Sequence, residues 1–332
     1  MTETLDAKWQ ARPEAGGRIG KWLLRTLAFR VGRRFALLIT YPVALYFMIR
    51  RAPERAASRL YLGRVLGRRP RPWEIYRHFL YFSIVTLDRL YLMADQFARF
   101  DVQIFGVEKL HAALAKGNGA LLLSGHLGSF DALRVLHTRS PLRVPIRILL
   151  DVGQNAGLSH MLNALNPNLA STIIDARRSG PELVLEMQSA LAKNSVVSTL
   201  ADRMRPGNSP IIADFLGAPA AFPASPWLFA GALHVPVVIA FGLYRGGRRY
   251  ELHFEEFPCE LPRDRGARRA ALAAIAQRFA DRLAHFARLA PYNWFNLYDF
   301  WNQAATADLP ATSNTAARAA VDIGDADAGT RH

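Results

Sequence analysis

From residue 101 to residue 289 the sequence alternates between short apolar runs and longer segments with helical periodicity. Such alternation is typical of βα units, in which a crossover helix connects two parallel strands. The expected strands are residues 101–105, 120–124, 144–150, 196–200, 235–243 and 250–254, and the expected helices are 129–136, 179–193 and 267–289. We therefore predict an α/β fold with a central, mainly parallel sheet flanked by helices.

An apolar run precedes this region, and arginine pairs close it at both ends. Residues 35–49 are almost all apolar, with Pro42 in the middle. The run is shorter than the roughly 20 residues that a spanning helix needs. A buried helix of a soluble protein is the alternative, but flanking arginines fit it poorly. We expect an N-terminal membrane-contacting helical segment, although the sequence does not decide whether residues 35–49 span or only insert.

The charge is strongly basic. Lys and Arg number 42 against 27 Asp and Glu, which gives a net charge of +15. Unless the arginines only reflect genome composition, this excess favours an anionic partner: a membrane, an acidic protein or nucleic acid. No nucleic-acid-binding motif is present, so we expect no nucleic acid partner. The single cysteine, Cys259, excludes an internal disulfide and a cysteine zinc cluster, and we expect no metal.

The segment 124–131, Ser-Gly-His-Leu-Gly-Ser-Phe-Asp, ends an apolar strand and begins a helix. Residues five apart on one helix point about 140° away from each other, so a pair between His126 and Asp131 needs a chain reversal. Gly125 and Gly128 permit that reversal. We predict that His126 is a general base for a hydroxyl proton, with Asp131 on its other ring nitrogen. The spacing alone is equally compatible with a capping aspartate beside an ordinary loop histidine.

This segment resembles motif one of the lysophospholipid acyltransferase superfamily, His-x4-Asp. Three other stretches resemble the lipid A biosynthesis (late) acyltransferase branch. They are Ala-Asp-Arg at 201–203, a glycine and proline loop at 215–226, and an aromatic signature at 294–301. The resemblance covers residues 20–303. The chain departs from the pattern at Asp131, where many members carry Glu.

The resemblance implies an enzyme that transfers an acyl chain from a thioester donor to a hydroxyl of a lipid or lipid-like acceptor. The donor is acyl carrier protein or coenzyme A, with no other cofactor. The expected partners are acyl carrier protein and a membrane lipid, and the expected location is the cytoplasmic face of the inner membrane, peripheral or monotopic. The motifs imply substrate-binding roles for Gly128, Ser129, Asp202, Arg203, Gly217, Phe222 and Pro223.

We expect three parts: a leader and membrane-contacting segment at 1–55, the acyltransferase catalytic domain at 56–303, and a disordered tail at 304–332. The acceptor stays open among lysophospholipids, lipid A precursors, glycolipids and aryl-polyene head groups. The alternative function is a non-catalytic membrane-binding protein on an acyltransferase scaffold. A separation of His126 from Asp131 would favour that alternative.

Overall fold

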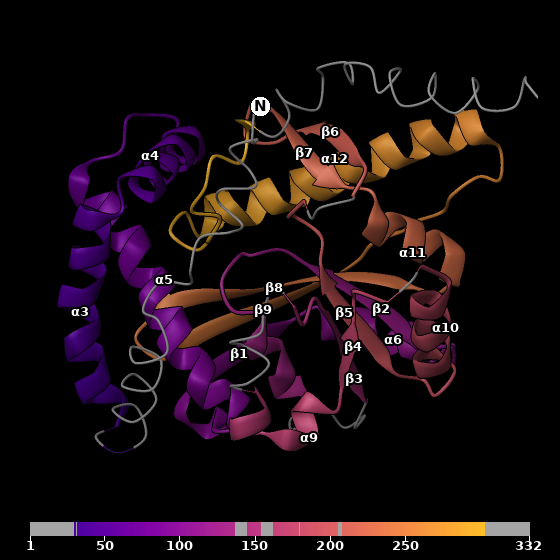
Figure 1. Cartoon of the computed structure of the whole chain (residues 1–332), viewed down its shortest axis with the longest axis horizontal. Coiled ribbons are helices and arrows are strands. Elements are labelled where there is room, and N and C mark those ends of the chain that lie inside the picture. The colour runs from indigo at the N-terminus through magenta and orange to yellow at the C-terminus, as the bar shows by residue number, and fades with distance from the viewer. Residues whose placement is uncertain are drawn as a thin grey trace, which may run out of the picture.

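The computed structural model describes residues 30, 32–136, 145–153, 162–178, 180–204 and 208–302. Seven strands form one sheet in the order β1-β9-β8-β2-β5-β3-β4, and β6 and β7 form a separate antiparallel hairpin (Figure 1). The strands are β1 (Asp101–Phe105), β2 (Ala120–Ser124), β3 (Ile146–Leu150), β4 (Ile173–Asp175), β5 (Val196–Leu200), β6 (Pro210–Asp214), β7 (Pro219–Pro223), β8 (Val237–Gly246) and β9 (Arg249–Glu256).

The strand directions place the carboxyl ends of five neighbouring strands at one edge of the sheet. Strands β8, β2, β5, β3 and β4 are parallel, whereas β9 is antiparallel to β8 and β1 is parallel to β9. The prediction of a central, mainly parallel sheet is thus confirmed. Ligand sites in such sheets lie outside the carboxyl ends of the strands.

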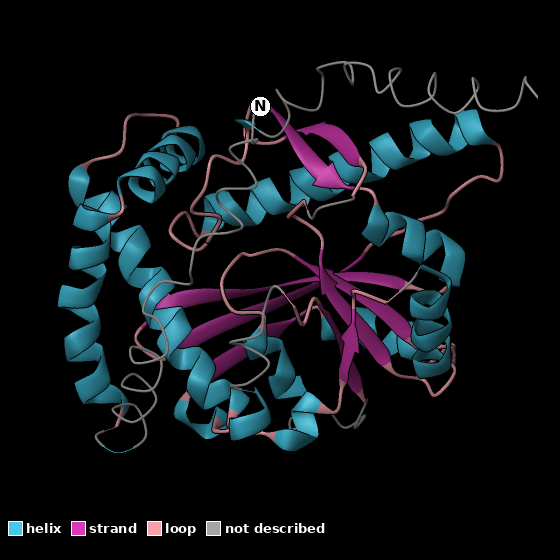
Figure 2. Cartoon of the chain, in the orientation of Figure 1, coloured by secondary structure: helices cyan, strands magenta, loops and turns pink. Residues whose placement is uncertain are grey.

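Helices flank the sheet (Figure 2). The helices are α3 (Arg33–Arg50), α4 (Ala52–Leu66), α5 (Pro72–Met93), α6 (Val107–Leu114), α9 (Pro167–Ala170), α10 (Gly180–Leu191), α11 (Ser225–Leu233) and α12 (Arg265–Leu289), with the 3-10 helices η1 (Phe97–Arg99) and η2 (Asp131–Val135). Phe286 of α12 packs against Phe241 of β8, with ring centroids 5.0 Å apart. Apolar packing of this kind is what fixes a helix on a sheet.

The N-terminal helices α3, α4 and α5 form a layer at one end of the sheet (Figure 1). Arg33 at the start of α3 donates from Nε and Nη2 to Asp88 of α5, at 2.6 and 2.8 Å. The Tyr250 hydroxyl of β9 also donates to Asp88, at 2.8 Å. These buried bonds fix α3 to α5 and to the sheet. No single helix in the described ranges is long and apolar enough to cross a membrane, but α3 and α4, bent by 97°, pass that criterion as a pair.

The elements differ from the predicted ones in a few places. An α-helix was expected over residues 129–136, but the structure has there only the 3-10 helix η2, Asp131–Val135. The boundary predicted between residues 55 and 56 falls inside α4, whose first turn contains Pro53. Most of the predicted leader and all of the tail at 304–332 lie outside the described residues.

Candidate active site

Two polar residues meet at the carboxyl ends of β2 and β5. These strands are parallel neighbours, with Ser124 paired to Leu200. The chain continues from β2 into His126 and from β5 into Asp202. The strand register therefore brings these two side chains together at the edge where sheets of this type bind ligands. We call His126 and Asp202 the candidate dyad.

The carboxylate of Asp202 accepts hydrogen bonds on both oxygens. Nδ1 of His126 lies 2.7 Å from Oδ1. Oδ2 accepts from the backbone N–H of His126 at 2.8 Å, from Nε1 of Trp294 at 3.2 Å and from Nδ2 of Asn296 at 3.0 Å. The carboxylate is fully buried, and a buried charge is stable only when such donors satisfy it.

The protonation states follow from this environment. Burial alone would raise the pKa of Asp202, but the interactions with His126, including its hydrogen bonds, and the charge of Arg203 lower the pKa to about 2. Burial, and next the charge of Arg203, lower the pKa of His126 below its ordinary value, against the opposing effect of Asp202. At neutral pH the imidazole is therefore neutral beside an ionised carboxylate.

The tautomer of His126 follows from the same argument. An ionised carboxylate only accepts hydrogen bonds, so Nδ1 carries the proton and Nε2 carries the lone pair. Within the described ranges Nε2 has no hydrogen-bond partner, and the side chain is 24% exposed. This arrangement can take a proton from a hydroxyl group placed at Nε2.

Gly128 and Ser129 shape the loop that carries His126. Gly128 has a φ of +69°, and a Cβ there would lie 1.9 Å from the carbonyl oxygen of Gly242, so no other residue fits without a shift of the backbone. The N–H of Gly128 donates to Asn293 O at 2.7 Å, and the N–H of Ser129 donates to Gly242 O at 2.7 Å. The Ser129 hydroxyl accepts from the N–H of Ala132 at 3.2 Å. Both residues thus position the loop backbone.

The predicted contact between Asp131 and the imidazole of His126 is wrong. Asp131 begins η2, and its Oδ2 lies 2.7 Å from Nε of Arg89 on α5. Asp202 occupies Nδ1 of His126 instead, because the neighbouring strand places it there without a chain reversal. The separation of His126 from Asp131 therefore does not favour a non-catalytic scaffold, since another carboxylate takes the predicted place.

Arg89 is a site residue that the sequence did not reveal. Its side chain is 37% exposed, and its charge is near enough to contribute to the lowered pKa of His126. Asp131, whose side chain is only 12% exposed, anchors the guanidinium through the 2.7 Å ion pair. The pair therefore fixes a solvent-accessible positive charge beside the candidate dyad.

Arg203 holds the C-terminal segment against the candidate dyad. Its Nε donates to Asn296 Oδ1 at 2.5 Å, and its Nη2 donates to Phe295 O at 3.1 Å. Asn296 in turn donates to Asp202. The predicted substrate-binding role of Arg203 stays a prediction, and these contacts show a structural role as well.

The remaining three predicted substrate-binding residues lie on the β6–β7 hairpin. Gly217 is at the exposed turn, where its N–H donates to Asp214 Oδ1 at 3.1 Å. Phe222 is fully buried and packs edge-on against Phe279 and Phe300. Among the three, only Pro223 lines a cleft beside the candidate dyad.

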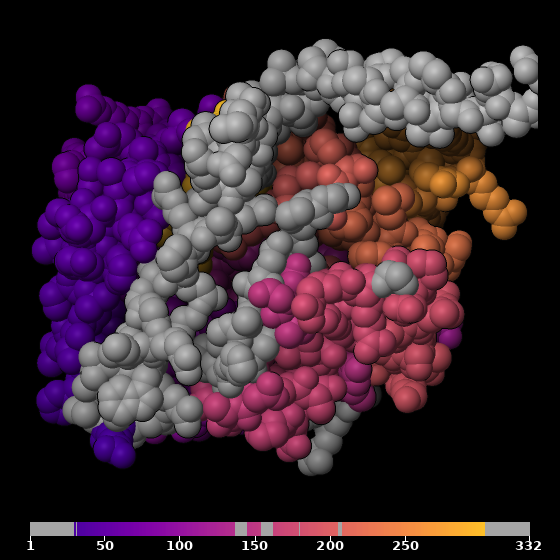
Figure 3. Space-filling model, in the orientation of Figure 1, coloured from indigo at the N-terminus to yellow at the C-terminus, as the bar shows by residue number. Residues whose placement is uncertain are grey.

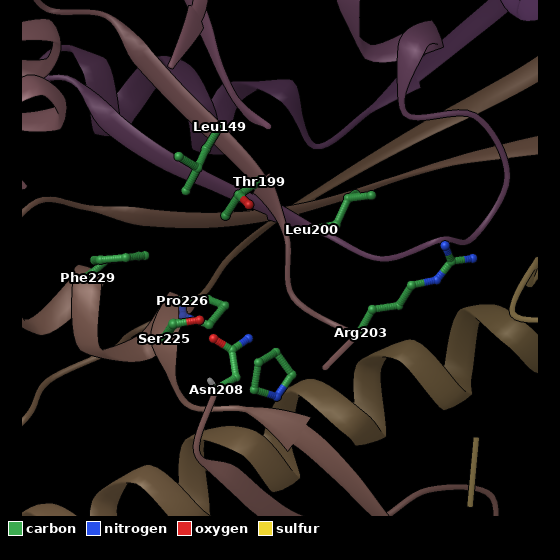
Figure 4. A pocket seen from close by; sticks show the side chains of 9 residues that line it. Leu149, Thr199, Leu200, Arg203, Asn208, Ser225, Pro226 and Phe229 are labelled. Atoms are coloured by element: carbon green, nitrogen blue, oxygen red, sulfur yellow. The ribbon is translucent and has the colours of Figure 1, made fainter. Parts of the chain in front are cut away.

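This cleft lies at the carboxyl ends of β3 and β5 and at the start of α11 (Figure 4). Its empty space is about 280 Å³, part of it open to solvent. In Figure 4 the Arg203 guanidinium extends away from the other labelled side chains, so the arginine borders the cleft rather than filling it. The lining residues are Leu149, Thr199, Leu200, Arg203, Asn208, Pro223, Ser225, Pro226 and Phe229.

The part of the chain that the structure describes contains no group of three His, Cys, Asp or Glu side chains that could hold a metal ion. The described groups at and near the candidate dyad are an imidazole, a carboxylate and two arginines, Arg89 and Arg203. These groups suit proton transfer and the stabilisation of negative charge.

Comparison with known proteins identifies the family of the chain. No curated protein matches the chain at a significant level. The family model described as bacterial lipid A biosynthesis acyltransferase matches residues 74–303, a range that contains the candidate dyad, the Asp131–Arg89 pair and the cleft. Because this match spans more than half of the chain, the protein belongs to the bacterial lipid A biosynthesis acyltransferase family.

Proposed function

We propose that the protein transfers an acyl chain from a thioester donor to a hydroxyl of a lipid or lipid-like acceptor, with His126 as the general base and Asp202 as its orienting carboxylate. The observation that carries this proposal is the 2.7 Å contact between Nδ1 of His126 and Oδ1 of Asp202. The contact leaves Nε2 with its lone pair, as a base requires. Membership in an acyltransferase family supports the reaction class.

The proposed reaction has two steps. Nε2 of His126 takes the acceptor proton while the acceptor oxygen forms a bond to the thioester carbonyl carbon. The resulting tetrahedral oxyanion then collapses, the C–S bond breaks, and the imidazolium returns the proton to the leaving thiolate. Asp202 stabilises the imidazolium between the two steps. The enzyme needs no nucleophile of its own.

The aspartate of the His-x4-Asp motif pairs with Arg89 and not with His126, so a different function is proposed for it. We propose that Arg89 binds an anionic group of the acceptor, such as a phosphate, because a guanidinium pairs with phosphate through two parallel hydrogen bonds. Asp131 would keep the guanidinium in place near His126. In this proposal Asp202 serves proton transfer, while Asp131 serves acceptor binding.

We propose that the cleft beside Arg203 binds the part of the donor that adjoins its thioester group. Leu149, Pro226 and Phe229 can contact methylene groups, and Ser225, Asn208 and Thr199 supply hydrogen-bonding groups. We expect the donor to be acyl carrier protein rather than coenzyme A, since carrier proteins are acidic and this chain carries +15.

We also propose that α3 binds the membrane. Large apolar side chains of α3 face solvent, among them Phe35 at 59%, Leu38 at 66% and Ile49 at 60% exposure. Arg34 and Arg50 are exposed at the two ends of the helix, where they can reach anionic head groups. Helix α3 forms an outer side of the molecule in Figure 3, with no described helix covering these residues. The inner membrane, at its cytoplasmic face, is the proposed location.

The test is transfer by the purified protein in detergent micelles. Acyl carrier protein and coenzyme A thioesters are supplied with hydroxyl-bearing lipids, and ester formation is followed by mass spectrometry. We expect the wild type to form an ester and His126→Ala to form none, because the base is lost. His253→Ala is the matched control, since His253 pairs with Glu251 on β9 and has no contact with the candidate dyad. Equal turnover by His126→Ala and wild type would contradict the mechanism, and thioester loss without ester would identify a hydrolase.

A further inference from the structure

One peptide group connects a buried histidine of the helical layer to the loop of the candidate dyad. The carbonyl of Trp294 accepts from Nε2 of His78 on α5, at 2.8 Å. The N–H of the same peptide, that of Phe295, donates to the carbonyl of His126 at 2.8 Å. A displacement of this peptide would therefore move the His126 backbone directly.

The hydrogen bonds of His78 define its tautomer. Because a carbonyl only accepts, Nε2 carries the proton, and Nδ1 accepts from the hydroxyl of Ser58 on α4 at 2.8 Å. His78 is completely buried, and burial lowers its pKa to about 4. The ring is therefore neutral at physiological pH. Because the His78 imidazole is neutral, buried and hydrogen-bonded through both ring nitrogens, it cannot act on a substrate. It instead holds its two hydrogen-bond partners in place.

The segment held by His78 contacts both members of the candidate dyad. We call residues 293–296 the clamp segment. Besides the bond to His126 O, Nε1 of Trp294 and Nδ2 of Asn296 donate to the Asp202 carboxylate. On its other side, the ring of Tyr61 on α4 packs 4.9 Å from the Trp294 ring and 5.3 Å from the His78 ring. The helical layer and the candidate dyad thus share the clamp segment.

We propose that His78 is a positioning residue for the reaction: through the clamp segment it sets the distance and orientation of His126 relative to Asp202. This inference rests on the proposed function for its kinetic consequences, but its geometric part does not. A proton-transfer pair is sensitive to small displacements, and a shift of about 1 Å can cost about 100-fold in rate.

The kinetic test replaces His78 without emptying its space. His78→Phe keeps a ring and removes both hydrogen bonds. We expect kcat to fall about 10- to 100-fold with KM changed less than about twofold, because positioning of the base is impaired and binding is not. His78→Gln should recover part of kcat, since its amide can still donate to Trp294 O. Ser58→Ala, which removes only the hydrogen bond to Nδ1 of His78, should lie between His78→Phe and wild type.

A second readout is independent of acyl transfer. Titration of the His126 ring, followed by NMR on histidine-labelled protein and assigned with His126→Ala, reports the environment of the candidate dyad directly. Release of the clamp segment exposes His126 to solvent and removes two donors that compete for Asp202. Both effects favour the imidazolium, so in His78→Phe the pKa of His126 should rise by about half a unit or more toward its ordinary value. This shift is expected whether or not the chemical proposal holds.

Tyr250→Phe is the matched control, because it also removes a buried hydrogen bond and keeps a ring, here the bond to Asp88. At equal loss of thermal stability, it should leave both kcat in detergent and the His126 pKa unchanged. Equal falls of kcat in His78→Phe and Tyr250→Phe would reduce His78 to a merely structural residue. A His126 pKa that is unchanged in both His78→Phe and Ser58→Ala would overturn the proposal as well.

Discussion

Nδ1 of His126 lies 2.7 Å from Oδ1 of Asp202, although 76 positions separate the two residues in the chain. The contact forms because β2 and β5 are adjacent and parallel, so the residues that follow them share one edge of the sheet. The buried carboxylate fixes the imidazole with its lone pair on Nε2.

The acid limb of the pH–rate profile should report the pKa of His126. Its pKa is lowered by burial and by Arg203, so protons leave the imidazole at a lower pH than from an ordinary histidine. The neutral form is the base, and kcat/KM should therefore rise with pH, with a midpoint below about 6.5, and stay constant above it. With a pKa of about 2, Asp202 adds no second limb in this range. The profile can be measured with a coenzyme A thioester from about pH 5 to 8. A midpoint above about 7 would contradict a lowered pKa of His126.

Replacing Arg89 should weaken binding of an anionic acceptor. Arg89→Ala removes up to two charged hydrogen bonds, so KM for such an acceptor should rise about 10-fold or more, while KM for the donor stays constant. Arg249→Ala, an exposed arginine at the start of β9, is the control for loss of one positive charge. An increase of donor KM alone in Arg89→Ala would assign this arginine to the donor.

A single charge on the apolar face of α3 should release the protein from membranes. Leu38 is 66% exposed on α3, and Leu185 is 65% exposed on α10. Leu38→Asp should reduce co-sedimentation with anionic vesicles several-fold, since a carboxylate resists insertion, whereas Leu185→Asp should sediment as wild type does. Equal release by both variants would indicate non-specific adsorption.

Salt should distinguish the two donors. The charge of +15 favours encounter with an acidic carrier protein. In detergent without anionic lipid, the second-order rate with acyl carrier protein should fall steeply between about 50 and 300 mM salt, where screening shortens to under about 10 Å. The rate with coenzyme A should fall less. Identical rates and slopes for both donors would exclude a dedicated surface for the carrier protein.

Most of the sheet could be predicted from the sequence because apolar runs such as 120–124 and 196–200 have the length of buried strands. The hairpin β6–β7 was missed, because prolines occupy both ends of β7, where turns are expected instead.

The site could be predicted only in part. The sequence predicts that His126 follows a strand. The carboxylate that binds its imidazole depends on which strand lies beside β2, and hydrophobic periodicity does not specify strand order. Asp202 was therefore given a substrate-binding role, and Asp131 was assigned to the imidazole. Arg89 gave no signal, because on an amphipathic helix such as α5 polar residues are ordinary.

The most direct test of the account compares the two carboxylates in one experiment. Single-turnover transfer from a bound thioester is measured for Asp202→Asn and Asp131→Asn at saturating acceptor, with folding checked by thermal unfolding. In Asp202→Asn the amide donates to Nδ1 and forces the proton onto Nε2, so the rate should fall about 1,000-fold or more. Asp131→Asn, which alters the ion pair with Arg89, should stay within about threefold of wild type. The opposite order, with Asp131→Asn inactive and Asp202→Asn nearly normal, would contradict His126–Asp202 as the pair that performs proton transfer.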